Sequence, residues 1–240
     1  FWIDYAQGFY KVMERIRAKY PDVLIQACAS GGGRVEYGAL RYFDEFWTSD
    51  NTEALSRARI QYGTSLFYPA VVMGSHVSAT PNHQTGNITP IKFRFDMACA
   101  GRLGMELQPK QMTDAEKEFA RRAIASYKEY RDIVMQGDLY RIGTPYDESG
   151  CYGVLYVAKD KRQAVLFAYS LRYQGRSLIP KFRLDGLDPK TEYTVRELNV
   201  DKPRFWFDGK TLSGELLMNA GINPHLSKIY DSAVFILKAK

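Results

Sequence analysis

The stretch Val23-Leu24-Ile25-Gln26-Ala27-Cys28, followed directly by Ala29-Ser30-Gly31-Gly32-Gly33-Arg34, decides the fold of this chain. Its first half is a short, mostly apolar run, which predicts a strand buried on both faces, as in a parallel sheet. The three glycines of the second half let the backbone approach a ligand closely and expose N–H groups to its oxygens. A flexible connection is the alternative. A phosphate-binding loop is a third interpretation, but the glycine spacing of neither standard phosphate motif is present.

On both sides of this stretch, helix and strand patterns alternate. Apolar residues at helical spacing predict an amphipathic helix over residues 3–19, which packs on another element and is stopped by Pro21-Asp22. Further patterns predict strands over 43–48, 66–73 and 102–107 and helices over 52–62 and 91–100. Thr113 and Glu116 have the spacing of a capping box and open a long helix that Gly137 closes. Four strand–helix units predict an α/β fold, about half of a (β/α)8 barrel, over residues 1–143.

From about Gly150 the sequence changes to short β-rich runs separated by turn signals such as Asp208-Gly209. Strands are expected over 151–158, 164–170 and 233–237. Residues 150–240 are therefore predicted to form a second, all-β domain, an antiparallel β-sandwich.

Composition limits the possible functions. The formal net charge is +6, but Lys and Arg are spread along the chain, so we expect no nucleic-acid partner. No apolar run reaches the length of a membrane span, and Cys28, Cys99 and Cys151 have neither disulfide nor zinc spacing. We therefore expect no membrane partner, metal or cofactor. The opening Phe1-Trp2-Ile3-Asp4 is neither a usual start nor a signal peptide, so we expect a piece of something longer.

The segment Phe46-Trp47-Thr48-Ser49-Asp50-Asn51 ends a predicted strand with an aromatic ring and a carboxylate. Reactive groups of β/α barrels lie just after the strands, and an aromatic face beside an acid suits a sugar ring. The alternative is structural, because Asp50 followed by Glu53 also has the spacing of a helix N-cap arrangement. Sequence spacing alone leaves both interpretations of Asp50 open.

Histidines and a cysteine give weaker signals. His76 and His83 fall in a predicted loop, and their spacing matches no helical metal pair, so loop-ordering hydrogen bonds are favoured over metal binding. Cys28 is either a small buried hydrophobe at a strand end or a side chain that lines a pocket. No His motif supports its use as a nucleophile.

Four ordered motifs together resemble glycoside hydrolase family 36. They are Cys28-Ala29-Ser30-Gly31-Gly32-Gly33-Arg34, Trp47-Thr48-Ser49-Asp50-Asn51-Thr52, Ile60-Gln61-Tyr62-Gly63-Thr64-Ser65, and His76-Val77-Ser78-Ala79 with Pro81-Asn82-His83-Gln84. The resemblance is strong over residues 9–140 and extends to the β-rich tail only in type. It implies the second half of the barrel, roughly strands five to eight, of a retaining α-galactosidase that acts on raffinose- or melibiose-type α-galactosides.

The resemblance also implies roles for residues. Asp50 matches the general acid/base, Cys28 and Gly31 match positions that hold the galactosyl ring, and Trp47 stands close to the pocket, with Ser30 counted among the substrate-binding residues. Ala29 and Ser30 depart from the commoner Cys-Ser-Gly-Gly-Gly-Gly-Arg pattern, which affects substrate preference more than reaction class.

The family's nucleophile lies in a Lys-Trp-Asp motif, which is absent from this sequence. We therefore expect the chain alone to be inactive and its exposed sheet edges to favour self-association. The full-length form is expected to be a cytoplasmic homo-oligomer. A noncatalytic carbohydrate-binding or structural fragment is the alternative.

Overall fold

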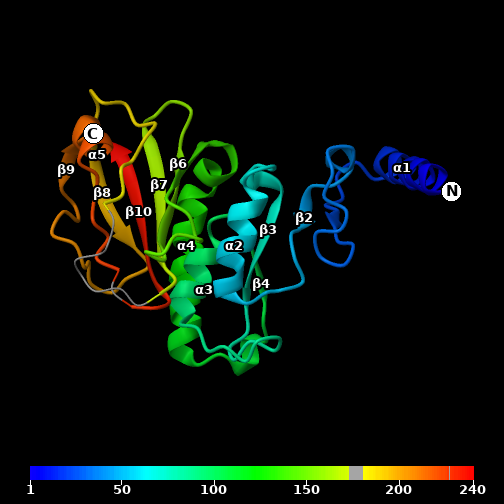
Figure 1. Ribbon diagram of the computed structural model, residues 1–240, viewed down its shortest axis with the longest axis horizontal. Coiled ribbons are helices and arrows are strands. Elements are labelled where there is room, and N and C mark those ends of the chain that lie inside the picture. Colours follow the sequence, from blue (N-terminus) through cyan, green and yellow to red (C-terminus); the bar gives the residue numbers. More distant parts are fainter. Residues whose placement is uncertain (173–180, 227) are drawn as a thin grey trace.

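The computed structural model describes residues 1–172, 181–226 and 228–240, which form two sheets with helices between them (Figure 1). The four-stranded sheet has the order β1-β2-β3-β4, and the six-stranded sheet has the order β5-β6-β7-β10-β8-β9. The first is parallel throughout and the second is antiparallel throughout. This agrees with the predicted change from an α/β region to an all-β region.

The parallel sheet is built from short strands joined by helices. Its strands are β1 (Gln26–Ala27), β2 (Glu45–Trp47), β3 (Met73–Ser78) and β4 (Arg102–Glu106). Its helices are α1 (Trp2–Lys19), α2 (Ala54–Thr64), α3 (Ile91–Ala98) and α4 (Asp114–Gln136), with 3-10 turns at Ala39–Arg41, Ala70–Val72 and Pro109–Gln111. The predicted capping box is confirmed, because Thr113 and Glu116 exchange hydrogen bonds at the start of α4, and Gly137 follows its end.

Two strand predictions are wrong. The strand expected over residues 23–28 is reduced to β1, and Val23 and Leu24 are exposed because β1 is the edge of the sheet. The strand expected over 66–73 is replaced by turns, with Leu66 and Phe67 exposed, and β3 follows it instead. The apolar run of 66–73 suggested a strand, whereas the strand itself carries glycine, serine and histidine.

Helix α1 lies at the end of the molecule remote from the antiparallel sheet (Figure 1). Met13 is its one buried residue, and the ring of Phe9 stacks on Phe43 at 6.1 Å. Within the described part of the chain, the expected packing of this helix is therefore limited to a narrow contact with the segment that precedes β2.

The antiparallel sheet begins directly after α4. Its strands are β5 (Asp138–Ile142), β6 (Cys151–Val157), β7 (Gln163–Ser170), β8 (Glu192–Leu198), β9 (Thr211–Ser213) and β10 (Asp231–Ala239), with α5 (Gly214–Asn219) after β9. Strand β5 pairs with β6, so the sheet starts before the predicted boundary at residues 143–150.

Both faces of this sheet are covered. Val165, Phe167 and Tyr169 of β7 belong to a core that also contains residues of α3 and α4. Alternate residues of the same strand, such as Leu166, pack into a second core with loop residues that include Phe182. Among the described residues the outer layer is made of loops, α5 and one short bridge between Phe182 and Ile222, rather than a second extended sheet.

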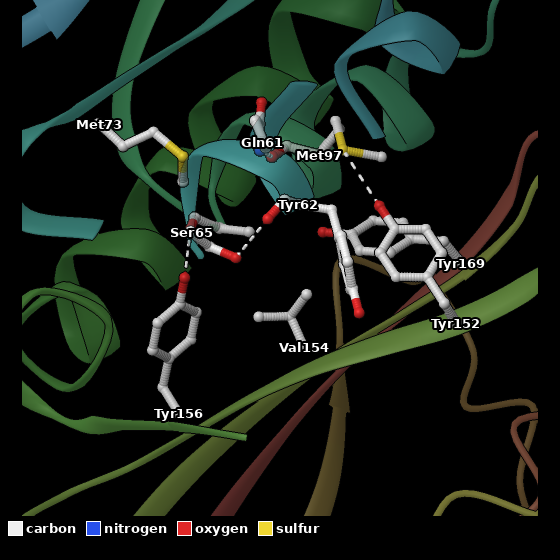
Figure 2. Close-up of a pocket in the computed structure, with 10 residues that line it drawn as sticks. Gln61, Tyr62, Ser65, Met73, Met97, Tyr152, Val154, Tyr156 and Tyr169 are labelled. Atoms are coloured by element: carbon white, nitrogen blue, oxygen red, sulfur yellow. Dashed lines mark hydrogen bonds between the residues drawn. The ribbon is translucent and has the colours of Figure 1, made fainter. Parts of the chain in front are cut away.

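Tyrosine hydroxyls of the antiparallel sheet form hydrogen bonds with the backbone at and just after helix α3. The hydroxyls of Tyr156 and Tyr169 donate to the carbonyls of Ala100 and Asp96 at 2.9 Å. Figure 2 shows these rings around a small cavity of ≈ 20 Å³ between the layers. It is far below the size of a ligand pocket, so it is a packing gap. In the described residues, no helix is both long and apolar enough to cross a membrane.

Candidate functional site

Asp50 lies in the loop between β2 and α2, at the carboxyl end of the parallel sheet, and is exposed. It is not the cap of α2. The N-cap is Glu53, whose carboxylate accepts hydrogen bonds from the backbone N–H groups of Leu55 and Ser56 at 2.9 and 2.8 Å. The structural interpretation of Asp50 is therefore wrong, and its carboxylate is left available.

The glycine-rich turn packs directly on the backbone beside Asp50. Gly31 has φ +70° and is buried, and a β-carbon added there would lie 2.8 Å from the backbone nitrogen of Asp50 and 3.0 Å from the Cα of Ser49. Gly32 meets the carbonyl oxygen of Thr48 in the same way, at 2.9 Å. These glycines are needed for close approach, and they bring two of the predicted motifs together.

Trp47 is nearly buried, with 8% of its surface exposed, and lies on the face of the sheet opposite the helices. Its ring centroid is 4.5 Å from that of His76, and the guanidinium of Arg57 lies 4.9 Å from the indole. Gly104 leaves room for the imidazole, because a β-carbon there would lie 2.3 Å from the ring.

A polar network continues along this open face. Arg102 forms a salt bridge with Glu45 at 3.0 Å, and Gln26 donates to Glu45. His76 Nδ1 lies 4.0 Å from a carboxylate oxygen of Glu106. These contacts join all four parallel strands, and Gln26, Glu45 and Arg102 are each the first residue of their strand.

Burial shifts the charge equilibria of two groups in this network. Desolvation lowers the pKa of Arg57 to about 10, although Glu106 opposes the shift. Desolvation also lowers the pKa of His76, against the opposing effect of Glu45 and Glu106 and with a smaller contribution from Arg57 in the same direction. The imidazole of His76 is therefore neutral near pH 7.

The interpretation of His76 as a loop residue is wrong, because it lies within β3 and packs on Trp47. His83 is exposed in the loop after β3, and no group of side chains that could hold a metal ion occurs in the described ranges.

The structure excludes one of the two interpretations of Cys28. The thiol is exposed just after β1, so the buried-hydrophobe interpretation is wrong. Ser30, its neighbour in the turn, is exposed and has φ 49°, a left-handed conformation that favours glycine.

Residues 79–90 form the third loop at this edge of the sheet, and it holds the Asp50 segment. The side-chain amide of Gln84 donates to the carbonyl of Asp50 at 2.7 Å and accepts from the N–H of Thr52 at 3.0 Å. Sequence reasoning missed Gln84 and Arg57. Gln84 belongs to one of the four motifs, but only the contact across the loops shows its use, and Arg57 has the sequence pattern of any surface helix residue.

A cleft of ≈ 580 Å³ adjoins the glycine turn from the side of α2. Gly32, Thr48 and Ser49 line it together with Arg59 and Ile60 of the helix. Asp50, Cys28 and Trp47 are not among its lining residues. Within the described residues, the predicted sugar-binding groups therefore gather on one edge of the sheet without forming an enclosed pocket.

Comparison with protein families gives two matches. The model described as Melibiase matches residues 3–137, and the model of the glycosyl hydrolase family 36 C-terminal domain matches residues 152–237. The two matched segments correspond closely to the parallel and antiparallel regions.

Individual relatives agree with these matches. The chain is 42% identical over 237 residues to α-galactosidase C of Emericella nidulans, which covers 98% of this chain and 30% of the relative. It is similar in structure to the galactosidase domain of the α-galactosidase–sucrose kinase AgaSK, with a TM-score of 0.90, 37% identity, and coverage of 99% of this chain and 32% of that one. The chain is also similar to a family 36 α-galactosidase, an AgaA variant of Geobacillus stearothermophilus solved in complex with raffinose. The TM-score is 0.88 at 35% identity, and the match covers 97% of this chain and 31% of that one. The chain thus spans about a third or less of the length of these relatives.

Proposed function

Because the chain belongs to the melibiase family, glycoside hydrolase family 36, we propose that it forms the C-terminal part of a retaining α-galactosidase. The observation that carries the proposal is the exposed Asp50, whose side chain does not cap its helix and whose backbone packs against the glycine turn. The substrates are terminal α-galactosides of the raffinose or melibiose type. The similarity to the AgaA variant, which was solved with raffinose bound, supports this substrate class.

In this mechanism Asp50 is the general acid/base. Its protonated form gives a proton to the glycosidic oxygen while that oxygen leaves the anomeric carbon and a second carboxylate attacks from the other face. The Asp50 carboxylate then takes a proton from water, which attacks the anomeric carbon and frees both galactose and the nucleophile. Asp50 ends the cycle protonated again.

The galactosyl ring would be bound by the groups beside Asp50. The glycine turn that contains Ser30 and Gly31 packs on the Asp50 backbone, so a sugar bound at Asp50 would present its hydroxyls to the turn. The exposed thiol of Cys28 lies at the same edge of the sheet. Trp47 stands close to this edge at the end of β2, where its ring packs against His76 and Arg57.

The nucleophile is proposed to lie in a part of the enzyme upstream of this chain. The carboxylates of the open face do not suit the role, because Glu45 is bound by Arg102 and Gln26, and Glu106 faces His76. We infer that the four parallel strands are strands five to eight of a (β/α)8 barrel, and that β1 pairs with the upstream half. A homo-oligomer of the full-length enzyme belongs to the same proposal.

Substituting Asp50 in the full-length gene product tests the function. Asp50→Asn should lower kcat/KM for raffinose by on the order of 10²- to 10⁴-fold, because the amide cannot donate or accept the proton. Steady-state release of galactose measures this loss. Asp22→Asn is the matched control, since Asp22 is also an exposed loop carboxylate, and it should change the rate little.

A loss of less than about threefold for Asp50→Asn, on an enzyme that releases galactose from raffinose, would show that another group performs proton transfer. The 240-residue chain alone should give no turnover. Calorimetric titration of this chain with galactose would then separate residual sugar binding from a purely structural role.

A further inference from the structure

The exposed carboxylate of Asp50 is not held by its own contacts. No other side chain or backbone group in the described ranges donates a hydrogen bond to it, so its position depends on the backbone of residues 49–52. A catalytic acid must be held in register with its substrate, and a displacement of about 1 Å can cost on the order of 100-fold in rate. The contacts that fix this backbone are therefore functional candidates.

Gln84 makes two hydrogen bonds to this backbone segment. One amide group spans the segment, since its Nε2 donates to the carbonyl of Asp50 at 2.7 Å and its Oε1 accepts from the N–H of Thr52 at 3.0 Å. The two bonds satisfy opposite polar groups on either side of Asn51. Such a two-point contact fixes both the distance and the rotation of the Asp50 backbone relative to the loop after β3.

The backbone at Gln84 is held by a buried neighbour. Asn82 is 3% exposed, and its Oδ1 accepts from the backbone N–H groups of Gln84 and Thr85 at 2.9 and 3.2 Å. Its Nδ2 donates to the hydroxyl of Thr52 at 3.2 Å. The loop is thus tied to the Asp50 segment at Thr52 through two different side chains.

The opposite side of the segment is closed by other groups. Gly31 packs against the backbone nitrogen of Asp50, and Arg57 donates to the carbonyl of Ser49 at 3.3 Å. Asp50 is therefore set between the glycine turn on one side and Gln84 on the other. Of these contacts, the Gln84 amide is the one that bonds to Asp50 itself.

We propose that Gln84 is a positioning residue for the acid/base function of Asp50. This inference rests on the proposed function. Gln84 does not touch the reacting atoms in this assignment; it holds the main chain so that the carboxyl group meets the glycosidic oxygen. Asn82 supports it by fixing the turn that presents the amide.

The test compares two substrates in the full-length gene product. Raffinose has a sugar leaving group that needs protonation, whereas 2,4-dinitrophenyl α-galactoside has one that leaves without it. Gln84→Ala and the similarly long Gln84→Met should lower kcat/KM for raffinose on the order of 30-fold and for the aryl galactoside less than about threefold. His83→Ala, at the exposed neighbouring position, is the control and should alter neither.

Equal losses on both substrates, or no loss on raffinose, would overturn the proposal, because a general structural role does not distinguish leaving groups. The Tm of each variant should remain within about 2 °C of the parent, and Gln84→Met serves if Gln84→Ala fails to fold. Asp50→Asn is measured in parallel. If it lacks the same dependence on the leaving group, the assignment of Asp50 fails and Gln84 with it; if it shows the dependence and the Gln84 variants do not, only the role of Gln84 fails.

Discussion

The six-stranded sheet and the four-stranded sheet of this chain differ in how their surfaces are covered. Seven of the eight residues of β7 are buried, and the strand packs on helices at one face and on loops at the other. In the parallel sheet, one face packs on helices while the other carries Trp47, His76 and charged residues, and β1 has a free edge. Exposed large apolar side chains are concentrated in residues 1–37, among them Trp2 and Leu24.

The antiparallel region and the parallel sheet therefore have different roles in stability and in function. The antiparallel sheet with α3 and α4 holds most of the buried apolar side chains, so it should carry most of the free energy of folding. The parallel sheet instead presents polar groups at the carboxyl ends of its strands, where an active site needs them. Its exposed apolar residues mark a surface that the proposed upstream part of the barrel would cover.

The same substitution in the two regions should therefore have very different effects. Phe167→Ala removes a fully buried ring of β7 that packs against Tyr130 and Tyr156, and should lower the free energy of unfolding by about 4 kcal/mol. Phe9→Ala, in α1, should lower it by less than about 1 kcal/mol, because that ring is only partly buried. Urea unfolding of the 240-residue chain, followed by far-UV circular dichroism, gives both values. Similar losses would show that α1 belongs to the main cooperative unit.

A smaller effect should come from the contact between α3 and the antiparallel sheet. Asp96 is fully buried and accepts hydrogen bonds from Ser232 at 2.7 Å, Asn199 at 2.8 Å and Lys92. Asp96→Ala leaves these donors without their acceptor and should cost about 3 kcal/mol. Urea unfolding measures the loss.

The matched control is Asp201→Ala. Asp201 also joins the two parts of the chain, through Arg122 at 2.6 Å, but its side chain is 83% exposed. Its removal should cost less than about 1 kcal/mol, because solvent screens exposed ion pairs. A cost for Asp96→Ala no larger than this would mean that the buried carboxylate does not hold the two regions together.

The contrast between the two sheets also explains which elements could be predicted from the sequence. Elements with complete local signals were predicted well. Thr113, Glu116 and Gly137 mark both ends of α4, strand β6 lies within its expected run, and β7 begins one residue before its own. Strand β3 was misplaced because its open face must be polar, so Gly74 and His76 gave no apolar pattern. The function of a strand face can therefore hide the strand from an interpretation that depends on hydrophobicity.

The site shows the same limit. Asp50 and the glycine turn were found because each has a motif of its own, and the structure adds that they touch. Gln84 was missed as a contact of Asp50 because the two residues are 34 positions apart and meet only when the loops after β2 and β3 come together. Arg57 was missed because burial, not residue type, distinguishes it from other helix residues.

The smallest predicted effect concerns His76, the titratable group packed on Trp47 in the open sheet. Burial lowers its pKa in the folded chain, against Glu45 and Glu106. Well above pH ~6.5 the imidazole is neutral in both folded and unfolded states. As the pH falls below that value, the unfolded chain takes up a proton that the folded chain resists, so the free energy of unfolding should decrease until the folded-state pKa is reached.

Replacing His76 with glutamine should remove this contribution. Urea unfolding of the parent and of His76→Gln at about pH 7.5 and about pH 5.5 should show a smaller decrease for the variant. His83→Gln, at an exposed position, should retain the decrease of the parent. An unchanged pH dependence in His76→Gln would mean that the parallel sheet does not unfold with the rest of the chain. The antiparallel sheet and the parallel sheet would then be separate folding units. The hydrogen bonds of Tyr156 and Tyr169 would join them only in the native state.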